Sequence, residues 1–304
     1  MIRFSKYIWV YFLLSGLVLV SGVFSLIRWG FRPSVDFSGG TLIEFTTNRD
    51  LSADTVKQTA AALKMDVASV QRAGNEHYIL RMKPTTSQTI SQLVSGIQSV
   101  NSVKVTIQSN QTVGPVLGRE LLQKATFAAL LAITAILLYV AWAFKNIKFG
   151  VAAVVALLHD LLVVLGSFSL FGHFLGVEVD TLFVTAFLTT MSFSVHDTIV
   201  VFDRIREYLK RDRSRPFEEL CDLALTETIN RSMTNSFTII FMLTALALMG
   251  GDTTKWFIIA LLIGTVSGTY SSPFIATPVL LLWDRWERSP RRRPAEVAGG
   301  KRSI

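Results

Sequence analysis

Six long apolar runs, separated by polar segments, dominate the pattern of the chain. Residues 7–27 contain no charge over 21 positions, and about 20 apolar residues cross a hydrocarbon core. A cleavable signal peptide would carry a shorter apolar region before a small-residue cleavage site, and neither feature fits. The remaining runs are 125–144, 149–172, 181–202, 232–251 and 256–283. We therefore predict an α-helical multi-pass membrane protein with six transmembrane helices, the last bending at Pro273 or Pro278.

The polar interval between the first two runs, residues 28–124, has the pattern of a small α+β domain. Alternation and helical spacing there are bounded by turn residues, with Ser52 as a helix N-cap. The predicted elements are a strand at 41–46, a helix at 52–64, strands at 67–72 and 77–82 around the Gly74-Asn75 turn, a helix at 86–97 and a strand at 102–108. This β-α-β-β-α-β order predicts a ferredoxin-like domain, a fold that names no function by itself.

The distribution of Lys and Arg predicts the orientation of the chain in the membrane. The chain is 50% apolar and 17% charged, with a formal charge of +8. With the N-terminus inside, seventeen Lys and Arg lie in the cytoplasmic segments and one, Lys255, lies in the opposite short loops. We therefore expect cytoplasmic termini, a cytoplasmic basic loop at 203–217 and an extracytoplasmic domain, and we attribute the basic excess to topology and lipid contact rather than nucleic acid. The single cysteine, Cys221, excludes an intramolecular disulfide.

Ionisable residues inside the spans are expected to have a partner or a function, because a charge in lipid costs about 2.5–3.5 kcal/mol. Asp160 lies at the middle of the third span beside His159, and Asp197 lies in the fourth beside His196. Arg231 opens the fifth span. A proton or ion pathway is the favoured interpretation, and an ion-pair network that only orients helices is the alternative. A metal site is less favoured, because HExxH is absent and adjacent helical residues point about 100° apart, so we expect no metal or cofactor.

Small and polar residues also recur at helical spacing in the spans. One face of the fourth span carries Thr185, Thr189, Ser192 and His196. On the sixth span, small residues recur every four positions and predict a close helix–helix contact. They are Gly264, Gly268 and Ser272.

Five segments resemble those of the SecF family of protein translocase subunits. The run SVHDTIVVFDRIRE at 194–207, which includes Asp203 and Arg204, resembles the family signature. VDFSGGT at 35–41, with Asp36, Gly39 and Gly40, resembles its D-F-x-G-G-T element. Three more segments resemble family segments and follow the family's order: LLHD at 157–160, INRSMTNS at 229–236 and GTYSSPFIA at 268–276. The resemblance runs from the first span to about Trp286.

The resemblance implies an architecture similar to RND transporters, with six spans and a periplasmic domain between the first two. The apolar runs divide the chain accordingly into a cytoplasmic N-terminus with the first span (1–27), a periplasmic domain (28–124), a five-helix bundle (125–286) and a basic cytoplasmic tail (287–304). The resemblance implies an inner-membrane subunit that works with SecD beside the SecYEG channel, with YajC and YidC as further candidate partners. Such a subunit is not an enzyme; it uses the proton-motive force to promote export of unfolded preproteins.

Carried over by position, Asp197 and Arg231 would belong to a proton relay completed by an Asp of SecD, and Asp160 matches another family acid. Ser192-Phe193 stands where the family usually has Gly-Tyr or Gly-Phe, and His196 where many members have Asn. His196 therefore adds a titratable group beside Asp197.

Two other classes of function compete with this interpretation. An RND-type half-transporter would export a small molecule, but such proteins are expected to carry two large periplasmic domains on twelve spans. A purely structural subunit would have membrane charges that never titrate.

Overall fold

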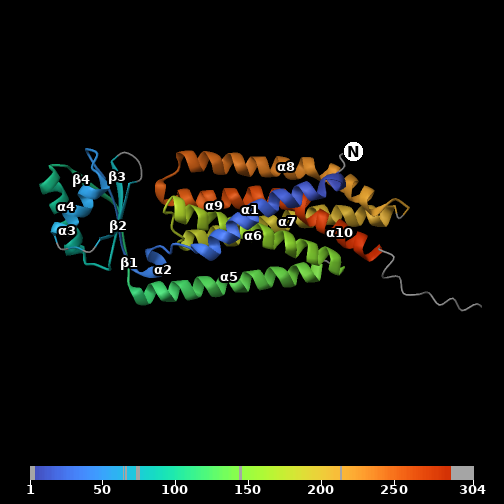
Figure 1. Cartoon of the computed structure of the whole chain (residues 1–304), viewed down its shortest axis with the longest axis horizontal. Coiled ribbons are helices and arrows are strands. Elements are labelled where there is room, and N and C mark those ends of the chain that lie inside the picture. Colours follow the sequence, from blue (N-terminus) through green and yellow to red (C-terminus); the bar gives the residue numbers. More distant parts are fainter. Residues whose placement is uncertain are drawn as a thin grey trace, which may run out of the picture.

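The computed structural model describes residues 4–63, 65, 67–72, 76–143, 146–212 and 214–288. A small α/β part lies at one end of a long helical bundle (Figure 1). In the described part of the chain, six helical stretches are long and apolar enough to span a membrane, which confirms the predicted number. They are Phe4–Arg28, Pro115–Val140, Ile147–Phe174, Thr181–Arg211, Phe217–Met249 and Thr254–Arg288.

The α/β part is a four-stranded sheet with two helices on one face. Neighbouring strands pair antiparallel in the order β2-β3-β1-β4. The elements follow one another as β-α-β-β-α-β, the order that the sequence predicted. Their bounds are β1 Gly40–Thr47, α3 Ala53–Ala62, β2 Val67–Arg72, β3 His77–Met82, α4 Ser87–Asn101 and β4 Val105–Val113.

Alternation in the strands places one face of this sheet against α3 and α4. Phe45 of β1 and Tyr78 of β3 stack at 5.4 Å, and both are fully buried. The predicted N-cap forms: the Ser52 hydroxyl accepts a hydrogen bond from the Thr55 amide at 3.0 Å. The other sheet face is turned toward the membrane helices (Figure 1).

Several predicted boundaries differ from the structure; for example, α4 extends to Asn101 rather than ending at residue 97, and β4 extends to Val113 rather than 108. Strand β4 begins at Val105 rather than at residue 102, because Ser102 takes a left-handed conformation (φ 49°) that ends α4. Helix α5 (Pro115–Ala143) begins ten residues before the apolar run at 125, so its first turns lie within the polar interval. The predicted turn at Gly74-Asn75 lies outside the described residues.

Helices α6, α7 and α9 form the centre of the bundle, and α5 and α8 lie on opposite flanks of it in the view of Figure 1. In the most apolar stretch of α6, 61% of residues are buried, whereas none is buried in that of α5, as expected for a helix at the periphery of the bundle. The bundle helices are α1 Ile8–Arg28, α6 Ile147–Phe174, α7 Thr181–Arg211, α8 Phe217–Met249 and α9 Asp252–Ser271.

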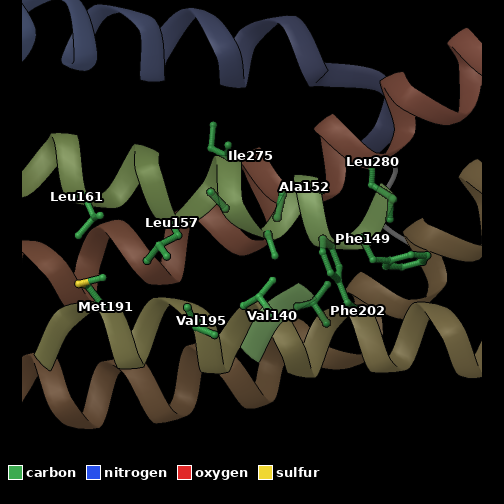
Figure 2. Close-up of a cluster of buried hydrophobic side chains, with 14 of the residues drawn as sticks. Val140, Phe149, Ala152, Leu157, Leu161, Met191, Val195, Phe202, Ile275 and Leu280 are labelled. Carbon is green, nitrogen blue, oxygen red and sulfur yellow. The ribbon is translucent and has the colours of Figure 1, made fainter. Parts of the chain in front are cut away.

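The bundle core is a continuous cluster of apolar side chains (Figure 2). Leu157 of α6 and Met191 of α7 are both almost completely buried in it. Toward one end, Phe149 of α6 meets Phe202 of α7 edge to face, with ring centroids 5.2 Å apart. This cluster fixes the mutual positions of the helices that carry the two His-Asp pairs.

The last span is interrupted where the sequence places Pro273. The α-helix gives way to a five-residue π-helical turn, Ser272–Ala276, and then continues as α10, Thr277–Arg288. Proline lacks an amide hydrogen and clashes with the preceding turn, so the helix widens there. Of the two positions predicted for a bend, Pro273 is the one within this turn.

Candidate functional site in the membrane helices

Asp160 is the centre of a buried hydrogen-bond cluster that joins three helices. Its carboxylate accepts hydrogen bonds from the hydroxyls of Ser194 on α7 and of Ser267 and Ser271 on α9, each at 2.6 Å. Nδ1 of His159 lies 2.9 Å from the same carboxylate. A carboxylate has about four acceptor sites, so these four contacts occupy its capacity. With only 4% of its surface exposed, Asp160 ties α6 to α7 and α9.

Small residues let α9 approach α7 closely enough for these bonds. A Cβ atom added to Gly264 would lie 2.1 Å from Thr190 Cγ2, and one added to Gly268 would lie 3.1 Å from the Cα of Ser194. One turn further along, the Ser272 and Thr198 hydroxyls are 3.0 Å apart. The seam of small residues on the sixth span therefore faces α7.

Asp197 has very different surroundings, although it also follows a histidine in the next helix. It is half-buried and borders a recess of about 20 Å³ between α7, α8 and α9. That volume exceeds the roughly 10–15 Å³ that a water molecule needs. A second, more apolar recess of about 60 Å³ borders Asp197 as well. The polar atoms of the first recess come from His196, Asn235, Ser236, Thr265 and Thr269.

The structure does not bring the three charged residues of the spans together. Within the described part of the chain, neither Asp197 nor Arg231 has a hydrogen-bond or ion-pair partner. Arg231 is exposed on α8, in a polar face that includes Asn230, Thr234 and Asn235, and His196 is exposed on α7. Asp160 is linked to the Asp197 segment through Ser194, which lies three residues before Asp197.

The DFSGG segment joins the first span to the start of α7. It forms a four-residue helix that the sequence did not predict, α2, Val35–Ser38. The Asp36 carboxylate accepts hydrogen bonds from the amide and the hydroxyl of Thr181, at 3.2 and 2.9 Å. Gly39 has φ 73°, and a Cβ atom there would lie 2.8 Å from the Cα of Pro115. The motif therefore acts as a tight corner at the start of α5 and α7.

A cleft of about 720 Å³ separates the open face of the sheet from the α6–α7 loop. Arg81 on β3 forms an ion pair with Glu178 of this loop at 2.8 Å, and Gln71 on β2 donates to the Gly176 carbonyl at 3.2 Å. Burial raises the pKa of Glu178 above its ordinary value, and Arg81 opposes that shift. Burial also raises the pKa of Asp180, with Asp36 adding to the effect.

The second half of the 194–207 motif organises the opposite end of the bundle. Asp203 pairs with Arg206 on the same helix. Arg204 pairs with Glu207 and with Glu227 of α8, which also accepts a hydrogen bond from the Tyr208 hydroxyl at 2.8 Å. These residues therefore bind α7 to α8 away from Asp197.

Sequence reasoning did not single out Ser267 and Ser271, the two α9 ligands of Asp160. Their four-residue spacing on an apolar helix was the available signal, since it places two hydroxyls on one face. It also missed the contact of α1 with α6, where a Cβ atom on Gly166 would lie 2.6 Å from the Cα of Gly22. Ser271 lies within the GTYSSPFIA segment at 268–276, whereas Ser267, Gly22 and Gly166 lie outside the recognised motifs.

Comparisons with known proteins agree with the motifs. The family described as "Protein export membrane protein SecD/SecF, C-terminal" matches residues 93–286. The protein translocase subunit SecF of Thermobaculum terrenum is 37% identical over 317 residues, which cover 98% of this chain and 99% of that protein. SecF of Synechocystis is 34% identical, with 97% of each chain covered.

Two solved structures share the fold. The crystal structure of SecDF from Thermus thermophilus, a translocon-associated membrane protein, is 28% identical with a TM-score of 0.84. A structure of SecDF in a super-membrane-facing form is 27% identical with a TM-score of 0.69. The matches cover 93% and 95% of this chain but only 39% and 40% of the longer SecDF chains. This chain is a membrane protein that belongs to the SecF family of protein translocase subunits.

Proposed function

We propose that this subunit works with SecD to couple the proton-motive force to polypeptide export through the SecYEG channel. Family membership supports the translocase role. The observation that carries the coupling is Asp197, a half-buried carboxylate beside a polar recess with room for water, inside a membrane span. Such a group can exchange a proton with water without first breaking a hydrogen bond within the chain. Intramembrane acids in these surroundings are typical of proton relays.

Arg231 is the second relay group in this proposal, and its exposure indicates where the partner binds. A cation exposed to hydrocarbon costs about 2.5–3.5 kcal/mol, which a carboxylate from another subunit would offset. SecD is the candidate, since the SecDF chains are more than twice as long as the part that this chain matches. The polar face of α8 around Arg231 would then pack against SecD helices rather than lipid.

Asp160 has a supporting role in this proposal. Its three bonds to serine hydroxyls hold α6, α7 and α9 together, and one of them comes from Ser194, one turn before Asp197. It therefore positions the α7 segment that carries the relay. His196, exposed beside Asp197, supplies a second titratable group.

The proposed location is the inner membrane, with both termini cytoplasmic and the α/β domain on the periplasmic side. The distribution of Lys and Arg supports this orientation. The domain would act on the emerging preprotein, and YajC and YidC are further candidate partners. The role requires no cofactor and no nucleic acid.

Preprotein translocation into inverted membrane vesicles tests the proposal. Vesicles containing SecYEG, SecD and this subunit would be assayed with and without a proton-motive force. We expect Asp197→Asn to abolish the proton-dependent part of export, and Arg231→Met to do the same, with membrane insertion intact. Asp54→Asn, an equal loss of charge on the exposed side of α3, is the matched control and should export normally. Export at the wild-type rate in both relay variants, at normal protein levels, would refute the relay.

A further inference from the structure

A basic cavity lies at the end of the bundle opposite the α/β domain. It has a volume of about 440 Å³ and opens between α6, α7, α8 and α10. Four of its lining residues are cationic: Arg206 and Lys210 on α7, Arg215 in the α7–α8 loop and Arg288 on α10. No carboxylate lines the cavity among the described residues. The positive-inside rule assigns this end to the cytoplasm.

The inner wall of the cavity is apolar. Phe149, Phe217 and Leu220 line it, and each is at least 93% buried. Phe149 belongs to the bundle core, beside Phe202 (Figure 2). A cationic rim above an apolar wall suits an amphiphile whose charged end is negative.

The cations have donors available for a ligand. Arg206 pairs with Asp203, Arg215 with Asp212 and Glu219, and Arg288 with Asp284. A guanidinium has five N–H donors, so Arg288, with one carboxylate partner, and Arg215, with two, each keep donors that can contact a ligand. Lys210 is exposed and has no carboxylate partner within the described part of the chain. Its ammonium group is therefore the most readily recruited of the four.

The aromatic residues near the cavity indicate that it lies at the level of the lipid headgroups. Helix α5 ends beside it, since Arg206 donates to the carbonyl of Ala143 at 3.4 Å. The last turns of α5 expose Tyr139 (51%) and Trp142 (77%), and such aromatic residues collect at the membrane–water interface. Basic pockets between transmembrane helices at this level bind anionic headgroups.

We infer that this cavity binds the phosphate headgroup of an anionic phospholipid from the cytoplasmic leaflet, with the acyl chains lying along the bundle. Arg206, Lys210, Arg215 and Arg288 would contact the phosphate. Residues 289–304 of the chain itself fit the site poorly, since they carry five Arg or Lys and one Glu. The bound lipid would clamp α7 to α10 and the α7–α8 loop.

Thermal unfolding in mixed micelles tests the inference. We expect phosphatidylglycerol to raise the midpoint of the wild-type protein relative to phosphatidylcholine, and the double variant Lys210→Gln/Arg288→Gln to lose most of this shift. Arg211→Gln is the matched control: it removes a charge from the next residue of α7, which does not line the cavity, and should keep the shift. Inorganic phosphate alone should produce no shift, because it cannot use the apolar wall.

Native mass spectrometry gives an independent readout if the double variant is unstable. The wild type and Arg211→Gln should retain phosphatidylglycerol through the gas phase more often than Lys210→Gln alone does. Equal retention and equal shifts in all variants would overturn the inference. A full shift with inorganic phosphate would show a simple anion site instead, and would overturn it too.

Discussion

The two His-Asp pairs of this protein look alike in sequence and have opposite environments in the structure. Asp160 is buried, bonded to three serine hydroxyls and next to His159 Nδ1. Asp197 is half-buried, has no hydrogen bond within the described residues, and borders a recess large enough for water. A carboxylate whose acceptor sites are all occupied by hydrogen bonds holds helices together. A carboxylate without such bonds, beside a recess with room for water, can change its protonation. Asp160 is therefore a structural tie between helices, whereas the surroundings of Asp197 suit the relay role that we propose for it.

The largest loss of stability is expected for a substitution of Asp160, and it tests the contrast between the two acids. Asp160→Ala leaves three buried serine hydroxyls and His159 without their acceptor, and each such group costs about 1–3 kcal/mol. We expect the free energy of unfolding in mixed micelles, followed by tryptophan fluorescence, to fall by at least about 3 kcal/mol. If the free energy of unfolding fell only as little as it does for a substitution at an exposed polar site, Asp160 would not hold the three helices together.

A smaller effect is expected where α7 and α9 approach each other, because this approach brings Ser267 and Ser271 to Asp160. Gly264→Ala would place a methyl group against Thr190, and overpacking of this kind costs about 1–3 kcal/mol. Gly16→Ala is the control, since a Cβ atom there meets nothing within 4 Å; it should not destabilise the protein, because alanine is favoured over glycine in a helix interior by about 1 kcal/mol. Equal stability of the two variants would contradict the close contact.

Asp197→Asn should change stability by no more than about 0.5 kcal/mol, because it removes no bond within the chain. The same unfolding measurement checks this value against Asp160→Ala. If Asp197→Asn destabilised the isolated subunit as strongly as Asp160→Ala, the contrast between the two acids would be wrong.

The smallest effect is a pH dependence outside the membrane, at the contact of the sheet with the α6–α7 loop. Burial raises the pKa of Glu178, so the folded state favours its protonated form. This contribution to stability is present below the ordinary carboxyl pKa and is lost as the pH rises through the raised value. We expect Glu178→Gln to flatten this part of the pH profile of thermal unfolding. An unchanged profile would mean that Glu178 does not titrate in this range.

Much of this architecture could be predicted from the sequence, because hydrophobic spans and alternating strands are local patterns. The six spans, the β-α-β-β-α-β order and the Ser52 cap were predicted correctly. The chemical contrast between Asp160 and Asp197 could not be predicted from the sequence, because it depends on which neighbouring helices face each acid. Ser267 is 107 residues from Asp160 along the chain, and only the packing of α9 brings the two together.

Local exceptions also escaped prediction. The short helix α2 has Ser34 as its N-cap, and its Asp36 bonds to Thr181, a residue 145 positions away. Strand β4 is displaced because Ser102 adopts a left-handed conformation that the alternating pattern does not reveal. In both cases a tertiary contact or a single backbone angle, rather than hydrophobic periodicity, determines the element.

Proton flux in vesicles that contain this subunit with SecD tests the central claim most directly. A pH-sensitive dye inside the vesicles would report the flux for the wild type, Asp197→Asn and the control Asp54→Asn, with each protein at equal level and stability. We expect normal flux with Asp54→Asn and loss of the SecD-dependent flux with Asp197→Asn. Wild-type flux with Asp197→Asn would contradict the central claim.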